Sequence, residues 1–150
     1  MATDDLSRLT SWADGLLASM EPAARRQLAS EMARTLRASQ TQRIRANLQP
    51  DGSPMAPRKP QLKLKKGRGR LRRKMFFKIS NPTWLKARAS EQQAMVEFVG
   101  TANRLATIHQ YGLKDRIKGR ETRYPARELL GITNQEVKRL EELLLAHLTQ

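Results

Sequence analysis

The chain has 150 residues, with 29 Lys and Arg against 14 Asp and Glu, and therefore a formal net charge of +15. It contains no cysteine, which excludes disulfide scaffolds, thiolate zinc sites and cysteine nucleophiles. The N-terminal residues are acidic, unlike a secretory signal, and the longest unbroken apolar run, 143–146, is far too short to span a bilayer. We therefore expect one domain over residues 1–150, in a reducing compartment, with no membrane partner.

The positive charge is concentrated in the middle of the chain. Residues 52–90 carry 13 basic and no acidic side chains, whereas residues 1–51 and 91–150 each have a balance of only +1. Prolines open the stretch 49–74 and two glycines loosen its most basic part, so we predict an extended basic loop over these residues. The residues of this basic loop expected to contact a partner protein or DNA are Lys63, Lys65, Lys66, Arg68, Arg70, Arg72, Arg73 and Lys74.

Apolar residues at three- and four-residue steps predict two amphipathic helices at the N-terminus. The first has its apolar stripe between Leu6 and Met20, and Thr3 is expected to cap it. Pro22 is tolerated in a first helical turn and opens the second helix, which must end before Pro50.

Downstream of the basic loop the pattern changes to strands and shorter helices. Alternating large and polar residues over 83–88 and 94–99 predict an antiparallel hairpin, and residues 101–109 predict a short helix. Thr133 and Glu136 form a capping box that opens a C-terminal helix. The predicted fold class is therefore α+β, with two N-terminal amphipathic helices, a long basic loop, a small antiparallel β-sheet, a short helix and a C-terminal helix.

The titratable residues do not assemble into a recognisable catalytic or metal site. His109 lacks a partner carboxylate or nucleophile in the sequence pattern, and we expect it to pack near a helix C-terminus, which favours its protonated form. His147 is expected on an exposed helical face, and the adjacent Glu141 and Glu142 diverge around a helix. We therefore expect no enzymatic activity, no cofactor and no metal.

The basic loop leaves two kinds of partner open. Its charge suits the phosphates of nucleic acid, which it would bind without sequence preference. Residues 58–74 contain no aromatic side chain on which bases could stack, however, and no recognition helix or zinc-finger pattern accompanies them. Docking on an acidic protein surface fits the composition equally well. A small nucleic-acid-binding protein is thus the alternative to a structural protein.

Four short motifs stand out in their order and spacing: Gln49-Pro50-Asp51-Gly52, Ala56-Pro57-Arg58-Lys59, Ile108-His109-Gln110-Tyr111-Gly112 and Tyr124-Pro125-Ala126-Arg127-Glu128-Leu129-Leu130-Gly131. Together they resemble the motifs of the phage virion morphogenesis family, and the resemblance covers essentially the whole chain. It implies a structural protein at the head-proximal end of a phage tail, which completes the tail and makes it competent to join a DNA-filled head.

The resemblance also implies partners and a place in the cell. The partners would be other phage tail and neck proteins, further copies of the chain in a homo-oligomeric ring of six-fold symmetry, and DNA in the tail channel. The protein would belong to the virion, in its tail or neck, after assembly in the host cytoplasm. The family has no recognised catalytic residues, in agreement with the absence of a catalytic pattern above.

The motif residues can be given structural roles. Gly112 is expected to end a helix with a positive φ, and Pro125 to open a short turn that Gly131 terminates. The apolar residues of 129–132 would seed the core beneath the final helix. Arg127 would fix the turn through backbone carbonyls or face a neighbouring subunit. The structural-motif residues are His109, Tyr111, Gly112, Pro125, Arg127, Leu129, Leu130 and Gly131.

Overall fold

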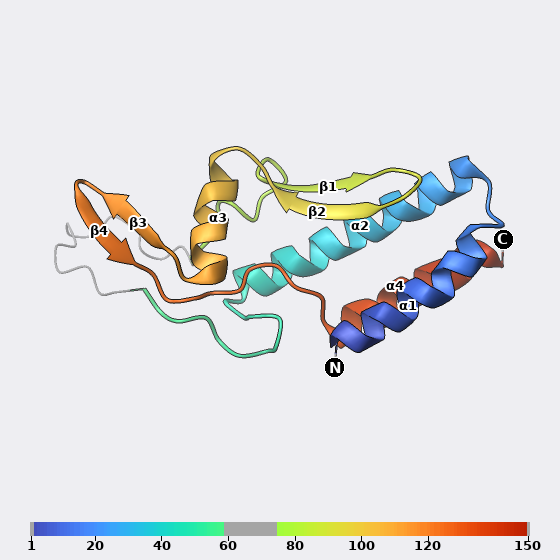
Figure 1. Ribbon diagram of the computed structural model, residues 1–150, viewed down its shortest axis with the longest axis horizontal. Helices are drawn as coiled ribbons and strands as arrows, with labels where there is room; N and C mark the ends of the chain where they lie inside the picture. Colours follow the sequence, from blue (N-terminus) through green and yellow to red (C-terminus); the bar gives the residue numbers. More distant parts are fainter. Residues whose placement is uncertain (1, 59–74, 150) are drawn as a thin grey trace.

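The computed structural model describes residues 2–58 and 75–149, and it confirms a mixed α+β fold (Figure 1). In these residues four helices combine with four short strands, which pair as two antiparallel hairpins. The helices are α1 (Ala2–Leu17), α2 (Pro22–Arg45), α3 (Thr101–Tyr111) and α4 (Asn134–Leu148), and the strands are β1 (Leu85–Ala89), β2 (Ala94–Phe98), β3 (Lys114–Ile117) and β4 (Arg120–Arg123).

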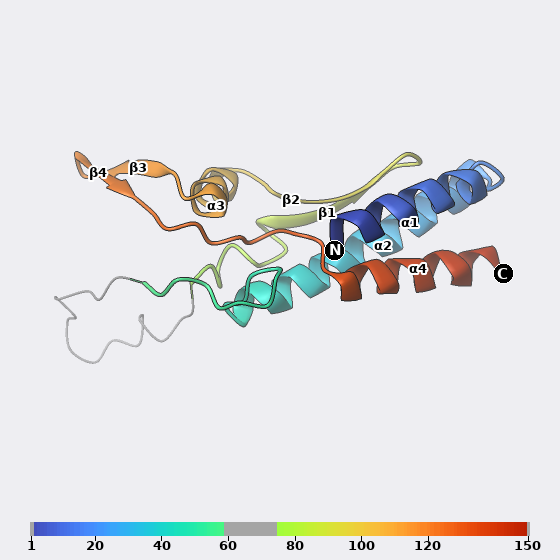
Figure 2. The same cartoon turned by 60° about the horizontal axis from the view of Figure 1, so that its bottom comes forward.

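Helices α1, α2 and α4 form a helical layer at one end of the molecule, with α4 packed against both of the others (Figure 2). Leu9 of α1 is buried with Val137 and Leu140 of α4. Leu28 of α2 is buried with Leu144 of α4. Burying a leucine contributes roughly 1.5–3 kcal/mol to stability. The stripe predicted for the second helix therefore packs against α4 only in part, since Ile44 near the end of α2 packs with Leu85 and Phe98 instead.

The boundaries of α2 and α4 follow the sequence signals. Helix α2 begins at Pro22 and ends at Arg45, before the prolines of the basic loop, as predicted. The capping box of α4 is present: the Thr133 hydroxyl accepts from the Glu136 N–H at 3.1 Å, and the Glu136 carboxylate accepts from the Thr133 N–H at 3.3 Å. These bonds satisfy N–H groups that a helix start would otherwise leave unpaired.

The start of α1 corrects one prediction. The helix already begins at Ala2, so Thr3 lies inside its first turn and does not precede it. Within the described residues, no helix is both long and apolar enough to cross a membrane.

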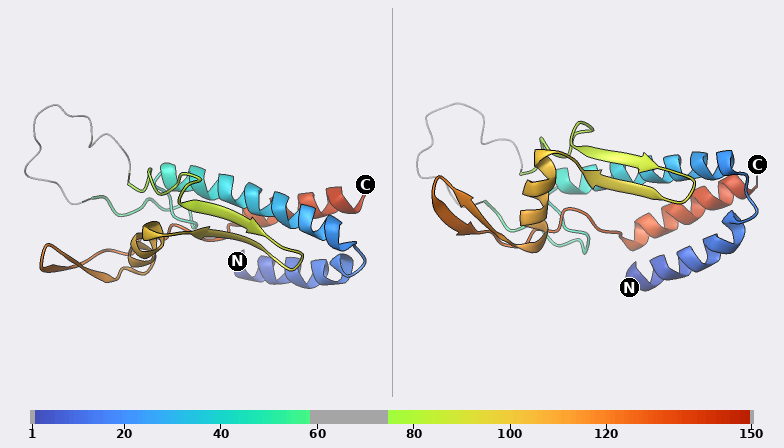
Figure 3. Two further views of the ribbon diagram at one scale, coloured as in Figure 1. Left: turned by 90° about the horizontal axis from the view of Figure 1, so that it is seen from above. Right: turned by 45° about the horizontal axis from the view of Figure 1, so that its top comes forward.

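The predicted hairpin is present as β1 and β2, and it lies along α2 (Figure 3). Its antiparallel register pairs Leu85 with Phe98. Both side chains are buried in the main core, together with Ile44 near the end of α2 and Ala102 of α3. This core joins α2 to α3 through the hairpin.

A second hairpin, β3–β4, corrects the expectation of one small sheet. Its register pairs Lys114 with Arg123 at the base of the hairpin. At its tip Lys118 and Gly119 both have positive φ, +51° and +78°, as a type I′ turn requires. Nearly every residue of these strands is polar, so they lack the apolar alternation from which strands are recognised in a sequence.

The connection from β4 to α4 also differs from the prediction. Residues 124–133 run extended, so Pro125 does not open a turn there. The fixed φ of proline is compatible with an extended chain as well as with a helical start. Leu129 is buried in the main core, and Leu130 packs against the same cluster. Only Ile132 of the predicted apolar set packs beneath α4.

Candidate functional site

The basic loop is the strongest functional candidate in the sequence. The structure describes the first residues of this loop, 49–58, and the chain that follows it from residue 75, and these two segments are called its flanks. Its eight predicted contact residues lie within 59–74, outside the described residues. At its start, residues 49–53 form a tight turn in which the Gln49 N–H donates to the Ser53 carbonyl at 2.8 Å. The Pro-Asp-Gly sequence of this turn favours that geometry. The flanks next to residues 59 and 74 define the site.

Arg127 holds the upstream flank. Its guanidinium donates to the Ala56 carbonyl from Nε at 2.6 Å and to the Pro57 carbonyl from Nη2 at 3.0 Å. Its Nη1 lies 3.0 Å from Nδ1 of His109, and the residue is only 4% exposed. Because a planar guanidinium presents its donors in fixed directions, these acceptors lock the flank in one position. Arg127 was predicted either to bind backbone carbonyls of its own turn or to face a neighbouring subunit. It does bind backbone carbonyls, but these carbonyls belong to the upstream flank of the loop.

His109 contacts the downstream flank. Its ring packs edge-on against Phe76, with the ring centroids 4.8 Å apart, and it lies tilted against the ring of Tyr124, with centroids 4.7 Å apart. Phe76 has a φ of +64°, an uncommon value for a residue with a side chain, which surrounding packing must hold in place. The backbone N–H of Arg127 donates to the His109 carbonyl at 2.7 Å. The His109–Arg127 pair therefore contacts both flanks of the basic loop.

The ring of His109 is neutral, which corrects the expectation of a protonated ring. Burial, and then the positive charge of Arg127, lower the pKa of His109 to about 4. Because the guanidinium can only donate, Nδ1 of the ring must accept, and the ring proton is assigned to Nε2. Burial and the charge of Arg58 also lower the pKa of Arg127, while Tyr124 raises it. The pair is thus a guanidinium cation bonded to a neutral base.

The end of α3 follows the prediction at Gly112. This residue has a φ of +64°, in the left-handed region, and terminates the helix. A Cβ atom at this position would lie 3.0 Å from the backbone nitrogen of Ala126. Glycine therefore allows the chain after β4 to pass close to the helix end. Tyr111, the preceding residue, is 70% exposed and lies outside this packing.

Gln110 was not singled out from the sequence, yet it fixes the extended connection before α4. Its side-chain oxygen accepts from the N–H groups of Leu129 at 2.8 Å and Leu130 at 3.1 Å. Its Nε2 donates to the Leu130 carbonyl at 3.0 Å. These partners lie 19 and 20 residues further along the chain, so no local pattern could reveal the contact.

A buried polar network ties Gly131 to α2 and α4. Gln40 donates to the Gly131 carbonyl and to Glu136 Oε2, each at 2.6 Å. Arg43 donates to Glu136 Oε1 at 2.6 Å, and it also bonds to Gln40. A Cβ atom on Gly131 would lie 2.5 Å from Cγ of Pro50. Close packing, and not the termination of a turn, is therefore what requires glycine at this position.

The surroundings of the two histidines are those of structural residues. His109 meets a guanidinium and two aromatic rings, and His147, expected to be exposed, has a side chain only 8% exposed with Nε2 3.0 Å from Glu31 Oε2. Within residues 2–58 and 75–149, no three His, Asp or Glu side chains are grouped so as to hold a metal ion.

Comparison with known proteins identifies a family and a relative that are similar to this chain. The phage virion morphogenesis family matches residues 4–149, which is nearly the whole chain. The tail completion protein S of Escherichia phage P2 is 43% identical over 148 residues, covering 97% of this chain and 98% of that relative. No solved structure matches. The motifs around the His109–Arg127 pair are therefore part of an end-to-end similarity, and the chain belongs to the phage virion morphogenesis family.

Proposed function

We propose that this protein completes the tail of a phage. The observation that carries the proposal is the 43% identity to the P2 protein named tail completion protein S, over 97% of this chain and 98% of that relative. A similarity that extends from end to end supports a shared role more strongly than a single shared motif would. It includes both the helical layer and the site that flanks the basic loop.

The resemblance of the motifs supports a finer role. The protein acts as a structural component, without catalysis, at the head-proximal end of the tail, and it makes the tail competent to join a DNA-filled head. Its copies form a ring, hexameric by the symmetry of the tail, in contact with other tail and neck proteins. Assembly takes place in the host cytoplasm, and the protein stays in the virion.

Within this role the basic loop makes the contact that joining requires. Residues 52–90 carry 13 basic and no acidic side chains, and such like charges repel one another, so fold stability does not account for them. The His109–Arg127 pair supports a binding role, because it holds both flanks of the loop at one place. The partner is an acidic surface of an adjacent tail or neck subunit, or the phosphates of DNA in the channel.

Complementation tests the proposal. A phage that lacks this gene should accumulate filled heads and separate, incomplete tails in electron micrographs. Supplying the chain from a plasmid should restore joined particles and plaque-forming units. Normal joining in the absence of the gene would overturn the proposal.

The concentration of charge in residues 52–90 also favours a second candidate, a nucleic-acid-binding protein without sequence preference. Binding of a short DNA duplex by the purified chain would then weaken steeply as the salt concentration rises, because each neutralised phosphate releases a counterion. If this candidate is right, a variant that no longer binds DNA should also fail to restore plaque formation in a phage that lacks this gene. Full complementation by such a variant would exclude it.

A further inference from the structure

Exposed apolar side chains are concentrated in the stretch of chain that runs from α3 into β3. Among the described residues, eight large apolar or aromatic side chains are exposed, and half of them fall between residues 105 and 117. Such clustering is informative because single exposed apolar residues are normal, whereas grouped ones mark interaction sites. The four are Leu105, Tyr111, Leu113 and Ile117, with exposed fractions of 41%, 70%, 43% and 46%.

The β3–β4 hairpin continues this surface away from the body of the molecule. Figures 1 and 2 show it at the end opposite to the one where α4 finishes. Its strands pair with each other, and all of its residues except Asp115 and Thr122 are exposed. An isolated two-stranded hairpin is at best marginally stable in water. A partner that covers one of its faces would therefore stabilise it.

The hairpin is also positively charged. Over residues 114–123 it has five basic and two acidic side chains. One of the acids, Asp115, already forms an ion pair with Arg104 of α3. The basic residues, all exposed, are Lys114, Arg116, Lys118, Arg120 and Arg123.

We propose that Tyr111, Leu113, Ile117 and the basic residues of β3–β4, together called the arm surface, dock on another tail protein. This inference rests on the proposed function. Because side chains alternate between the two faces of a hairpin, Ile117 and Leu113 lie on one face, and Lys114, Arg116 and Arg123 lie on the other. The partner therefore holds the hairpin from both sides, with an apolar surface against the first face and an acidic surface against the second. Exposed tyrosine, arginine and aliphatic side chains together are the composition of protein–protein contact surfaces, where Tyr and Arg supply much of the binding energy.

Two other occupants fit these observations less well. Nucleic acid would satisfy the charge through its phosphates but would leave the aliphatic Leu113 and Ile117 uncovered. A second copy of this chain that used the same surface would bring the basic residues of both hairpins together, and like charges repel. A different, acidic protein meets both the charge and the apolar requirement.

Two sets of substitutions test the arm surface in the full-length chain. The charge variant is Lys114→Gln, Arg116→Gln, Arg120→Gln and Arg123→Gln, and the apolar variant is Tyr111→Ser, Leu113→Ser and Ile117→Ser. The matched controls change equally many exposed residues elsewhere: Arg8, Arg34, Lys138 and Arg139 to Gln for charge, and Leu48, Phe77 and Leu145 to Ser for apolar area.

The measurement is binding to tails purified from a phage that lacks this gene, together with the restoration of head joining. Both arm variants should bind these tails at least about tenfold more weakly than the wild type, while the controls stay within about twofold. Far-ultraviolet circular dichroism verifies folding. If the apolar variant fails to fold, the charge variant, altered only at exposed positions, decides the outcome.

Each contrary result has its own meaning. Arm variants that bind and restore tails like the wild type would overturn the docking surface while leaving the proposed function intact. A charge variant that loses binding to a short DNA duplex but keeps binding to tails would assign the arm to nucleic acid, and so overturn the inference. Failure of the wild-type chain to bind tails or restore joining would overturn the proposed function, and the inference with it.

Discussion

The buried, neutral ring of His109 makes the stability of this protein depend on pH. Its pKa is about 4 in the folded chain against 6.5 for a free histidine, so between these values the unfolded state binds the additional proton. Stability is therefore complete above pH 6.5 and falls as the pH is lowered towards 4. The loss should be roughly 1–3 kcal/mol, measured by urea unfolding at neutral pH and at a pH near 4.

The control for this prediction is His109→Gln. The glutamine side-chain oxygen can accept from Arg127 as Nδ1 does, but it does not titrate. The variant should lose the part of the pH dependence that His109 contributes, and virion yield should stay within a few-fold of normal. Parallel loss of stability in variant and wild type would assign the pH dependence to other groups.

Two glycines offer a matched pair of substitutions to alanine. A Cβ on Gly131 would lie 2.5 Å from Pro50, whereas a Cβ on Gly15 of α1 would meet nothing within 4 Å. Gly131→Ala should therefore destabilise the fold by about 1–3 kcal/mol, because the packed proline must move. Gly15→Ala should stabilise it by up to about 1 kcal/mol, because alanine favours a helix. Thermal unfolding of both variants measures the contrast, which equal shifts would contradict.

At the scale of elements, the basic loop is expected to act in assembly and not in folding. The described flanks are held by Arg127 and His109, and neither contact uses the charged side chains of residues 59–74. Neutralising the loop should therefore leave the melting temperature nearly unchanged and cause poor incorporation into tails, or tails that do not join heads. The substitutions are Lys65, Lys66, Arg68, Arg70, Arg72 and Arg73 to Gln.

The two contrary outcomes for this variant differ. Unfolding would show that the stretch is structural and that the loop assignment is wrong. Normal folding together with normal joining would show that the charge has no part in joining.

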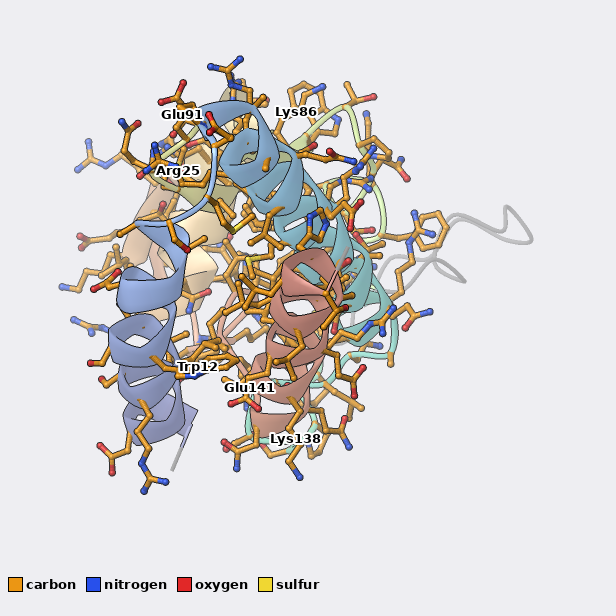
Figure 4. The ribbon with its side chains drawn as sticks, turned by 90° about the vertical axis from the view of Figure 1, so that its right-hand side faces the viewer. Trp12, Arg25, Lys86, Glu91, Lys138 and Glu141 are labelled. Atoms are coloured by element: carbon orange, nitrogen blue, oxygen red, sulfur yellow. The ribbon has the colours of Figure 1, made fainter. Side chains whose placement is uncertain are left out.

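At the scale of the whole molecule, the proposed ring should persist at high salt. Apolar side chains remain exposed on the helical layer, among them Trp12 of α1, which is labelled in Figure 4. Contacts between such apolar faces are not screened by ions, whereas contacts between exposed charges are. Light scattering at low and high salt should give the same particle mass. Dissociation at high salt would show that charges hold the ring together.

How much of this fold could be predicted depends on how local its determinants are. The start of α2 at Pro22, the capping box at Thr133 and the helix end at Gly112 were predictable, because each depends on a few neighbouring residues. The β3–β4 hairpin was not, because polar strands leave no apolar period. Neither were the partners of Arg127: Ala56 and Pro57 lie 71 and 70 residues away in the sequence.

The polar network of Gln40, Arg43, Gly131 and Glu136 has a consequence for folding in the cell. Its hydrogen bonds join residues 91, 96 and 93 positions apart, and Leu9 at the start of the chain is buried against α4 at its end. Contacts so distant in sequence slow folding, because a long loop must close before they form. On the ribosome, α1 and α2 are complete well before α4 emerges, and until then their apolar stripes stay uncovered. The nascent chain is therefore expected to need a chaperone until synthesis ends, and lowering the growth temperature should increase the soluble yield.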